Sequence, residues 1–189
     1  MRTFLAALAA LGLATLPAVS ATLDERLAPC RACHGEKGQS DNPLVPSLGA
    51  QPKDFLLVQL YIFRENMRKV ELMNEMTKGL TDDELRAMSE SLAKLPAPMP
   101  VPEAIDPARM ERAKTLVAQN HCNFCHAPTF AGQDQIPRLA AQREDYLLKS
   151  LREYKSGARP GYEPAMASVV QPMKDEDFVE LAYYLARVK

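Results

Sequence analysis

HCNFCHAPTF, residues 121–130, contains a short motif of cysteines and a histidine, and PCRACHGEKG, residues 29–38, contains a second copy of it. In each stretch two residues separate a pair of cysteines, and a histidine follows the second cysteine directly. The motifs consist of Cys30, Cys33 and His34 in the first copy and of Cys122, Cys125 and His126 in the second. Because the chain has four cysteines in all, the two motifs use every one of them.

The Cys-x-x-Cys-His pattern is typical of covalent attachment of a c-type haem. The two thiols form thioethers with the haem vinyl groups, and the histidine is placed to ligate the iron. A disulfide does not require an adjacent histidine. Structural zinc takes four ligands rather than three, and thioredoxin-like motifs lack the histidine and occur in a βαβ pattern that is absent here. The sequence therefore predicts two covalently attached haem c groups, one for each motif.

The chain begins MRTFLAALAALGLATLPAVSA, residues 1–21. A positive Arg2, an apolar run and small residues before a cleavage point are typical of a secretory signal peptide, which we expect to be cleaved near Ala21. A retained N-terminal anchor is the alternative, although the apolar run is short for a membrane span. The formal net charge of −1 gives no basic surface that would indicate a nucleic-acid partner.

An internal repeat covers most of the remaining chain. VPSLGAQPKDFLLVQLYIFRENMR, residues 45–68, aligns without gaps with IPRLAAQREDYLLKSLREYKSGAR, residues 136–159. The identical pairs include Pro46 and Pro137, Leu48 and Leu139, Gln51 and Gln142, and Arg68 and Arg159. The repeat predicts two domains, residues 22–95 and 106–189, and the proline-rich residues 96–105 predict a stiff, extended linker between them.

Both domains have helical patterns. In residues 81–95, apolar residues recur at helical spacing, with Thr81 as N-cap and Glu84 at the capping-box position. Residues 174–188 repeat this pattern, and Asp106 followed by Pro107 predicts the start of a helix that leads into the second motif. Middle helices are expected to begin near Asp54 and Asp145. With no convincing strand, the predicted class is all-α, each small domain folding around one haem.

The sixth iron ligand must come from elsewhere in each domain. His121 directly precedes Cys122 and cannot reach the far face of the haem bound beside it. Aligning LTDDELRAM, residues 80–88, with MKDEDFVEL, residues 173–181, brings Met73 and Met166 into equivalent positions. The other methionines considered are Met67, Met76 and Met173, for which packing roles are the alternative. We therefore expect His34 and Met73 on one iron and His126 and Met166 on the other.

Ligation by one histidine and one methionine affects both the reduction potential of the haem and the access of a substrate to the iron. A thioether ligand raises the reduction potential relative to two histidines. With both axial positions filled by the protein, the site is suited to passing single electrons rather than to activating a substrate. Pro46 and Pro137 could place a carbonyl against the free ring N–H of each histidine, or could be ordinary loop prolines. Arg68 and Arg159 could pair with haem propionates, or could be solvated.

These residues resemble the dihaem cytochrome c4 family, whose members consist of two tandem class I cytochrome c domains. The resemblance rests on the two haem motifs, the Pro-x-Leu turns, the Leu-Gly-Ala-Gln and Leu-Ala-Ala-Gln segments and the distal methionines. It implies a periplasmic electron carrier, soluble or peripherally membrane-associated. It also implies redox protein partners, such as a quinol-oxidising bc-type complex as donor and a terminal oxidase as acceptor. The sequence departs from the family at its start, because only residues 22–29 of the expected mature chain precede Cys30, which predicts a short leading helix.

Two other functions remain open on the sequence. The chain could be the dihaem electron-accepting subunit of a periplasmic dehydrogenase of the sulfide- or sulfite-oxidising type. It could also be a dihaem peroxidase, which needs one haem with an open or displaceable distal position. Because both domains offer an aligned methionine, we expect an electron carrier and not an enzyme.

Overall fold

The computed structural model describes residues 21–159 and 164–189, and in these residues the chain is built from helices. The helices are α1 (Leu23–His34), α2 (Lys53–Arg64), α3 (Glu71–Thr77), α4 (Asp82–Ala93), α5 (Pro107–Gln119), α6 (Cys122–Cys125), α7 (Glu144–Ser156), α8 (Pro164–Val170) and α9 (Asp175–Arg187). The isolated bridge between Gln133 and Ile136 is the one β-type pairing in this part of the chain. The predicted signal peptide lies outside the described residues, except for Ala21.

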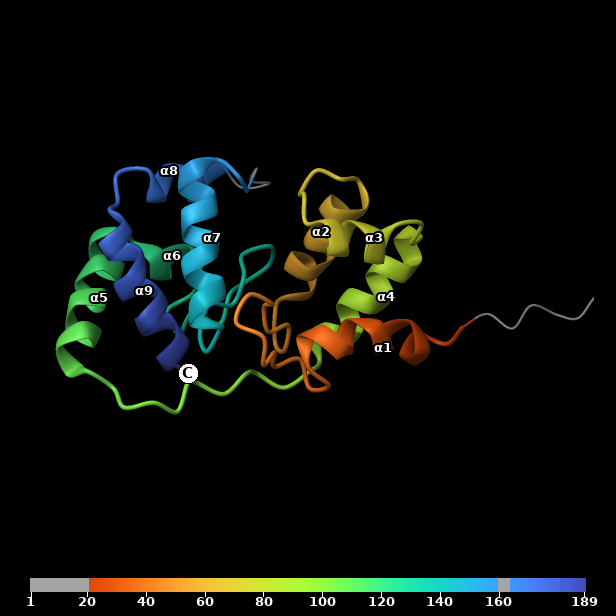
Figure 1. Cartoon of the computed structure of the whole chain (residues 1–189), viewed down its shortest axis with the longest axis horizontal. Coiled ribbons are helices and arrows are strands. Elements are labelled where there is room, and N and C mark those ends of the chain that lie inside the picture. Colours follow the sequence, from red (N-terminus) through yellow and green to blue (C-terminus); the bar gives the residue numbers. More distant parts are fainter. Residues whose placement is uncertain (1–20, 160–163) are drawn as a thin grey trace, which may run out of the picture.

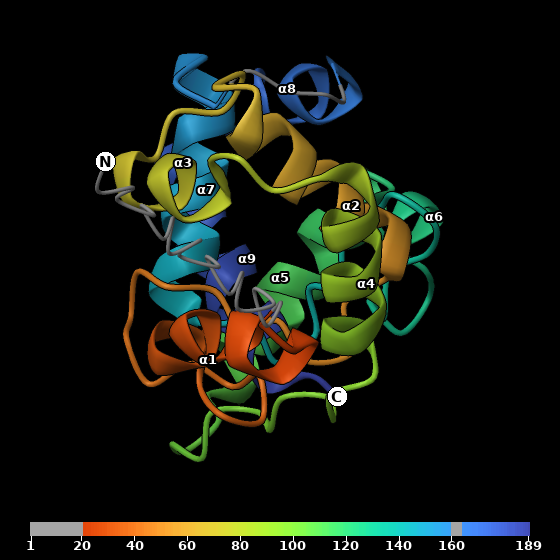
Figure 2. The same ribbon diagram turned by 90° about the vertical axis from the view of Figure 1, so that its right-hand side faces the viewer.

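The helices form two groups that lie side by side (Figure 1). Helices α1 to α4 form the first domain and α5 to α9 the second, and the helix pairs in contact are all within one domain. Figure 2 looks along the line that joins the domains, with α1 and α4 in front of α5 and α9. The second domain repeats the order of the first, with α7, α8 and α9 in the places of α2, α3 and α4.

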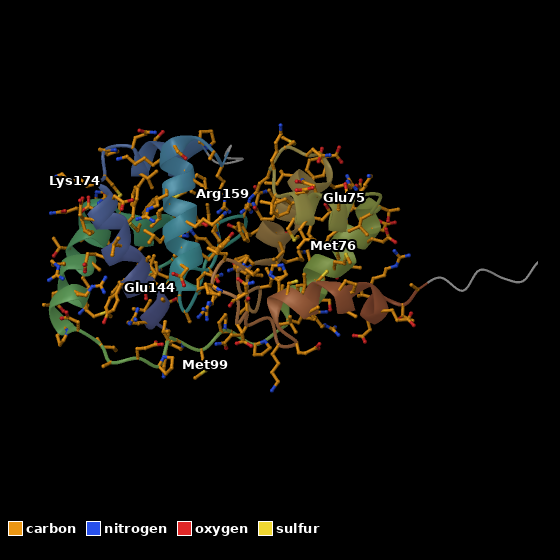
Figure 3. The ribbon with its side chains drawn as sticks, in the orientation of Figure 1. Glu75, Met76, Met99, Glu144, Arg159 and Lys174 are labelled. Atoms are coloured by element: carbon orange, nitrogen blue, oxygen red, sulfur yellow. The ribbon has the colours of Figure 1, made fainter. Side chains whose placement is uncertain are left out.

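The segment between the domains, residues 96–106, contains no helix. It runs past both domains, with Met99 near its middle (Figure 3). The side-chain amide of Gln39 bonds the backbone N–H and C=O of Met99, at 3.0 and 3.4 Å. At the other end the Tyr183 hydroxyl accepts from the Asp106 N–H at 2.7 Å. These bonds hold the extended segment against each domain in turn.

The core of the first domain lies between α1, α2 and α4. Its fully buried residues are Leu27, Leu56, Met88 and Leu92. As the sequence predicted, few residues of α1 precede Cys30, but the helix continues through the haem motif to His34. Leu27, 1% exposed, and an ion pair of 2.6 Å between Arg26 and Glu84 keep this short helix in contact with α4. The short helix α1 therefore still packs against α4.

The core of the second domain centres on α9, which packs against both α5 and α7. Phe178 is 1% exposed, and Ala182 and Ala186 are completely buried. Such small residues allow neighbouring helices to approach closely. The buried residues of α9 thus pack against α5, which precedes the second haem motif, and against α7, which follows it.

Helix starts follow the predicted capping chemistry. Thr81 and Glu84 form the predicted capping box, and Asp106 caps α5 with Pro107 in its first turn. A further capping box, which the sequence analysis missed, joins Thr22 and Glu25 at the start of α1. Within the described residues, no helix combines the length and the apolar character that crossing a membrane requires.

Candidate haem-binding sites

The first motif lies at the C-terminal end of α1. Cys30 is half-buried and packs against the core, Cys33 is exposed, and His34 is 8% exposed. Cys30 and His34 are four residues apart, so they share one face of the helix. Burial raises the pKa of the Cys30 thiol and lowers the pKa of the His34 imidazole. The helix therefore presents a buried neutral imidazole next to two thiols.

The second motif has the same burial pattern on a different local structure. His121 adopts a left-handed conformation, with φ of 53°, which separates α5 from the short helix α6. The His121 side chain is exposed. Cys122 is half-buried, Cys125 is exposed, and His126, directly after α6, is 5% exposed. The two motifs thus differ in backbone conformation, but their two cysteines and histidine have the same pattern of burial.

Each motif histidine is oriented by a backbone carbonyl. The distance from His34 Nδ1 to the Pro46 oxygen is 2.7 Å, and that from His126 Nδ1 to the Pro137 oxygen is 2.9 Å. A carbonyl only accepts, so Nδ1 carries the proton in both rings. In the neutral imidazole this leaves the lone pair on Nε2, the form needed to bind a metal ion. The prediction that these prolines orient the histidines is confirmed.

The two aligned methionines lie on the short helices α3 and α8. Met73 and Met166 are both half-buried, and Met166 packs against the core of the second domain. Asn74 fixes the start of α3, because its side chain accepts from the Val70 N–H at 2.8 Å and donates to the Arg68 carbonyl at 2.9 Å. Helices α3 and α8 were not predicted from the sequence.

The competing methionines lie in different surroundings. Met67 is 54% exposed and Met76 is 37% exposed, whereas Met173 is 5% exposed in the core of the second domain. Met73 and Met166 are the pair that combines equivalent positions with intermediate burial.

Arg68 and Arg159 are buried, which excludes the alternative that they are solvated. Arg68 donates to the Gln59 side chain at 2.6 Å, and Arg159 donates to the Ser150 hydroxyl at 2.9 Å. Each guanidinium also stacks on an aromatic ring of its own domain, Phe63 and Tyr154 respectively. Among the described residues neither arginine has a carboxylate within ion-pair distance. Arg159 lies on the side of the second domain that faces the first (Figure 3).

This set of donors fits covalently bound haem in each domain. Each motif offers an accessible thiol, a half-buried thiol and a neutral imidazole with a free Nε2, and a buried arginine is available for a propionate. In the part of the chain that the structure describes, no group of three or more His, Cys, Asp or Glu side chains could hold a metal ion. The thiols, the imidazole and the buried arginine of each domain together match the chemistry of a covalently bound haem.

Comparison with known proteins agrees with this geometry. The cytochrome c family profile matches residues 110–189. A cytochrome c4 from Thiocapsa roseopersicina is 30% identical over 168 residues, which cover 82% of this chain and 85% of the relative. This chain belongs to the cytochrome c4 family. The family assignment from sequence is thereby confirmed.

Similarity to a solved cytochrome c4 supports the two-domain fold. The crystal structure of reduced recombinant cytochrome c4 from Pseudomonas stutzeri aligns with a TM-score of 0.80 at 26% identity, covering 88% of this chain and 97% of that one. The predicted pair of tandem class I cytochrome c domains is confirmed. As a cytochrome c4, the chain carries two covalent haem c groups and transfers electrons rather than acting as an enzyme.

One further relative has a more specific description. A thiosulfate dehydrogenase electron acceptor from Stutzerimonas stutzeri (strain A1501) is 26% identical over 174 residues, which cover 84% of this chain and 78% of the relative.

Proposed function

We propose that this cytochrome c4 is a periplasmic carrier that takes single electrons from a donor such as a quinol-oxidising bc-type complex and delivers them toward a terminal oxidase. The N-terminal sequence supports export, because it has the pattern of a cleaved signal peptide. Each proposed domain, residues 22–95 and 106–189, holds one haem. Cys30 and Cys33 form the thioethers in the first domain, and Cys122 and Cys125 form them in the second.

The proposed axial ligands are His34 and Met73 in the first domain and His126 and Met166 in the second. The observation that carries this proposal is the repeated orientation of the histidines, each with Nδ1 bonded to a proline carbonyl and Nε2 left for iron. The equivalent positions of the two methionines on α3 and α8 support it further.

Bound haem supplies the one-electron chemistry, and the protein supplies its setting. The fixed histidine rings and the methionine thioethers would ligate the iron in both of its oxidation states. Little rearrangement of the protein would therefore accompany electron transfer. The thioether raises the reduction potential relative to a second histidine. The buried guanidinium groups of Arg68 and Arg159 are the proposed partners of haem propionates, since charge-assisted bonds of this kind are strong.

Separate replacement of the methionines tests the ligation. In the oxidised protein, Met73→Ala and Met166→Ala are each expected to halve the far-red absorption band of methionine bound to ferric haem. Met76→Ala is the matched control and is expected to leave the band unchanged. A Met73→Ala protein with a full band, together with a halved band in Met76→Ala, would move the first ligand to Met76.

A second function has one observation in its favour, the similarity to the thiosulfate dehydrogenase electron acceptor. In this alternative the chain is the dihaem electron-accepting subunit of a periplasmic dehydrogenase. The fold and ligation would be the same, but a catalytic partner would accompany the chain. Isolation of the tagged protein from its own cells separates the two proposals. A carrier is expected to be recovered alone, whereas a dehydrogenase subunit would be recovered with a stoichiometric catalytic subunit.

A further inference from the structure

Two glutamines of the repeat reach across the boundary between the domains. Gln142 of the second domain accepts from the Ser47 N–H at 2.7 Å and donates to the Ser47 carbonyl at 2.8 Å. Gln51 of the first domain accepts from the Arg138 N–H at 3.0 Å and donates to the Arg138 carbonyl at 2.9 Å. Both glutamines are at most 5% exposed. Because Ser47 and Arg138 are themselves equivalent in the repeat, the two pairs of bonds are related by symmetry.

The peptide groups that receive these bonds also orient the haem histidines. The Ser47 N–H belongs to the same peptide group as the Pro46 carbonyl, which accepts from His34. In the same way, the Arg138 N–H belongs to the peptide group of the Pro137 carbonyl, which accepts from His126. Each histidine is therefore connected, through one peptide group, to a glutamine of the opposite domain.

The backbone before each glutamine has an unusual conformation. Ala50 and Ala141 are left-handed, with φ of 50° and 56°, a region that is unfavourable for residues with a Cβ. Their N–H groups are held by the carbonyls of Leu95 and Leu185, at 3.0 and 2.9 Å. Both copies thus adopt the same strained backbone where the glutamine turns toward the other domain. Strain of this kind persists where the surrounding structure holds it in place.

Hydrogen bonds in series polarise one another. When the glutamine oxygen accepts from the peptide N–H, the carbonyl of that peptide becomes a better acceptor. A stronger bond from histidine Nδ1–H to that carbonyl makes the ring a more basic ligand, as partners of metal-bound histidines do in general. A more basic ligand favours ferric iron and lowers the reduction potential.

We infer that Gln51 and Gln142 are positioning residues that set the reduction potential of the haem in the opposite domain. Gln142 acts on His34 and Gln51 acts on His126. This inference rests on the proposed ligation of iron by these histidines. Contact between the domains therefore helps to set the reduction potential of each haem.

The test uses the complete dihaem protein. In Gln142→Met, the reduction potential of the haem attached through Cys30 and Cys33 is expected to rise. A tenfold change in the reduction equilibrium constant corresponds to about 59 mV for one electron. In Gln51→Met, the rise is expected at the haem attached through Cys122 and Cys125. The haems are distinguished by their methyl resonances in NMR spectra recorded during redox titration.

Gln39→Met is the matched control. Gln39 bonds the N–H and C=O of Met99 in the same two-bond arrangement, whereas the two haem-motif histidines bond the carbonyls of Pro46 and Pro137. This control is expected to leave both potentials unchanged. Amide hydrogen exchange gives a second readout, because Ser47 in Gln142→Met and Arg138 in Gln51→Met should exchange faster than in the unmodified protein.

A shift of equal size at both haems, a shift only at the haem of the substituted domain, or no shift would overturn the inference. If a methionine variant fails to fold, Gln142→Glu keeps the acceptor oxygen and is expected to retain slow exchange at Ser47 without raising the potential. A raised potential in Gln142→Glu would also count against it. Absence of the methionine–iron band in the unmodified protein would instead contradict the proposed methionine ligation.

Discussion

The guanidinium of Arg68 in the first domain donates a 3.3 Å hydrogen bond to the phenol oxygen of Tyr146 in the second. Arg159, the repeat equivalent of Arg68, is close enough for its charge to act on the same phenol. The residue equivalent to Tyr146 in the first domain is Phe55, which has no hydroxyl. A single phenol is therefore bonded to the buried cation of the first domain and lies within the field of that of the second, and it makes the boundary between the domains asymmetric.

Tyr146→Phe should weaken the contact between the domains. The substitution removes one long hydrogen bond to a charged group, which is expected to reduce stability by about 1 kcal/mol. The midpoint of thermal unfolding should then fall by about 2–4 °C. Tyr61→Phe is the control, because Tyr61 is 44% exposed on α2. Equal midpoints for the two variants would contradict a stabilising role for the Tyr146 hydroxyl.

Titration of Tyr146 tests whether the two arginines pair with haem propionates. Burial raises the pKa of the phenol, but the charges of Arg159 and Arg68 outweigh this and lower the pKa to about 7. Propionates paired with these arginines would offset their charge, so we expect a Tyr146 pKa above 7 in the dihaem protein. The measurement is the pH dependence of the tyrosine ring carbon signals in NMR, assigned with Tyr146→Phe. A midpoint that stays near 7 would argue against the pairing.

Asp175 should make the second domain sensitive to acid. Its carboxylate, at the start of α9, accepts from Arg152 Nε and Nη2 at 2.7 and 2.6 Å, and these hydrogen bonds lower the pKa of Asp175. A lowered carboxyl pKa stabilises the folded state at pH values above the unfolded pKa of about 3.9. That stabilisation is lost as the pH falls through the folded pKa.

Asp175→Asn should therefore unfold at a lower temperature than the unmodified protein at pH 7, and the difference should shrink below about pH 4. Asp83→Asn is the matched control, since Asp83 is in the first turn of α4 and its ion pair with Arg86 is local and exposed. A midpoint difference for Asp175→Asn that is constant with pH would show that its carboxylate charge is not the cause.

Much of the site follows from local sequence signals. The haem motifs, the caps at Thr81 and Asp106 and the buried stripe of α9 each depend on residues close together in the chain. The repeat alignment paired Met73 with Met166 because both precede a helix start by the same number of residues. The orientation of the histidines by Pro46 and Pro137 was predicted as one of two alternatives, and the structure decides between them.

What the sequence could not provide depends on contacts between distant segments. The alignment identified Gln51 and Gln142 as identical, but their partners lie in the other domain, far away in sequence. The surroundings of Arg68 likewise include a residue of the other domain, Tyr146. The left-handed His121 separates α5 from α6, whereas α1 runs through its motif without a break, and no local pattern in the sequence distinguished the two cases.

We propose that the protein supplies both axial ligands to both irons, an arrangement suited to a carrier rather than to a catalyst. Addition of carbon monoxide to the reduced, unmodified dihaem protein tests this most directly, because the gas binds ferrous haem where an axial position is open or its ligand is easily displaced. We predict that the visible absorption spectrum stays unchanged. A carbon monoxide complex at either haem would show that this iron has an open or displaceable axial position, contrary to the proposed ligation.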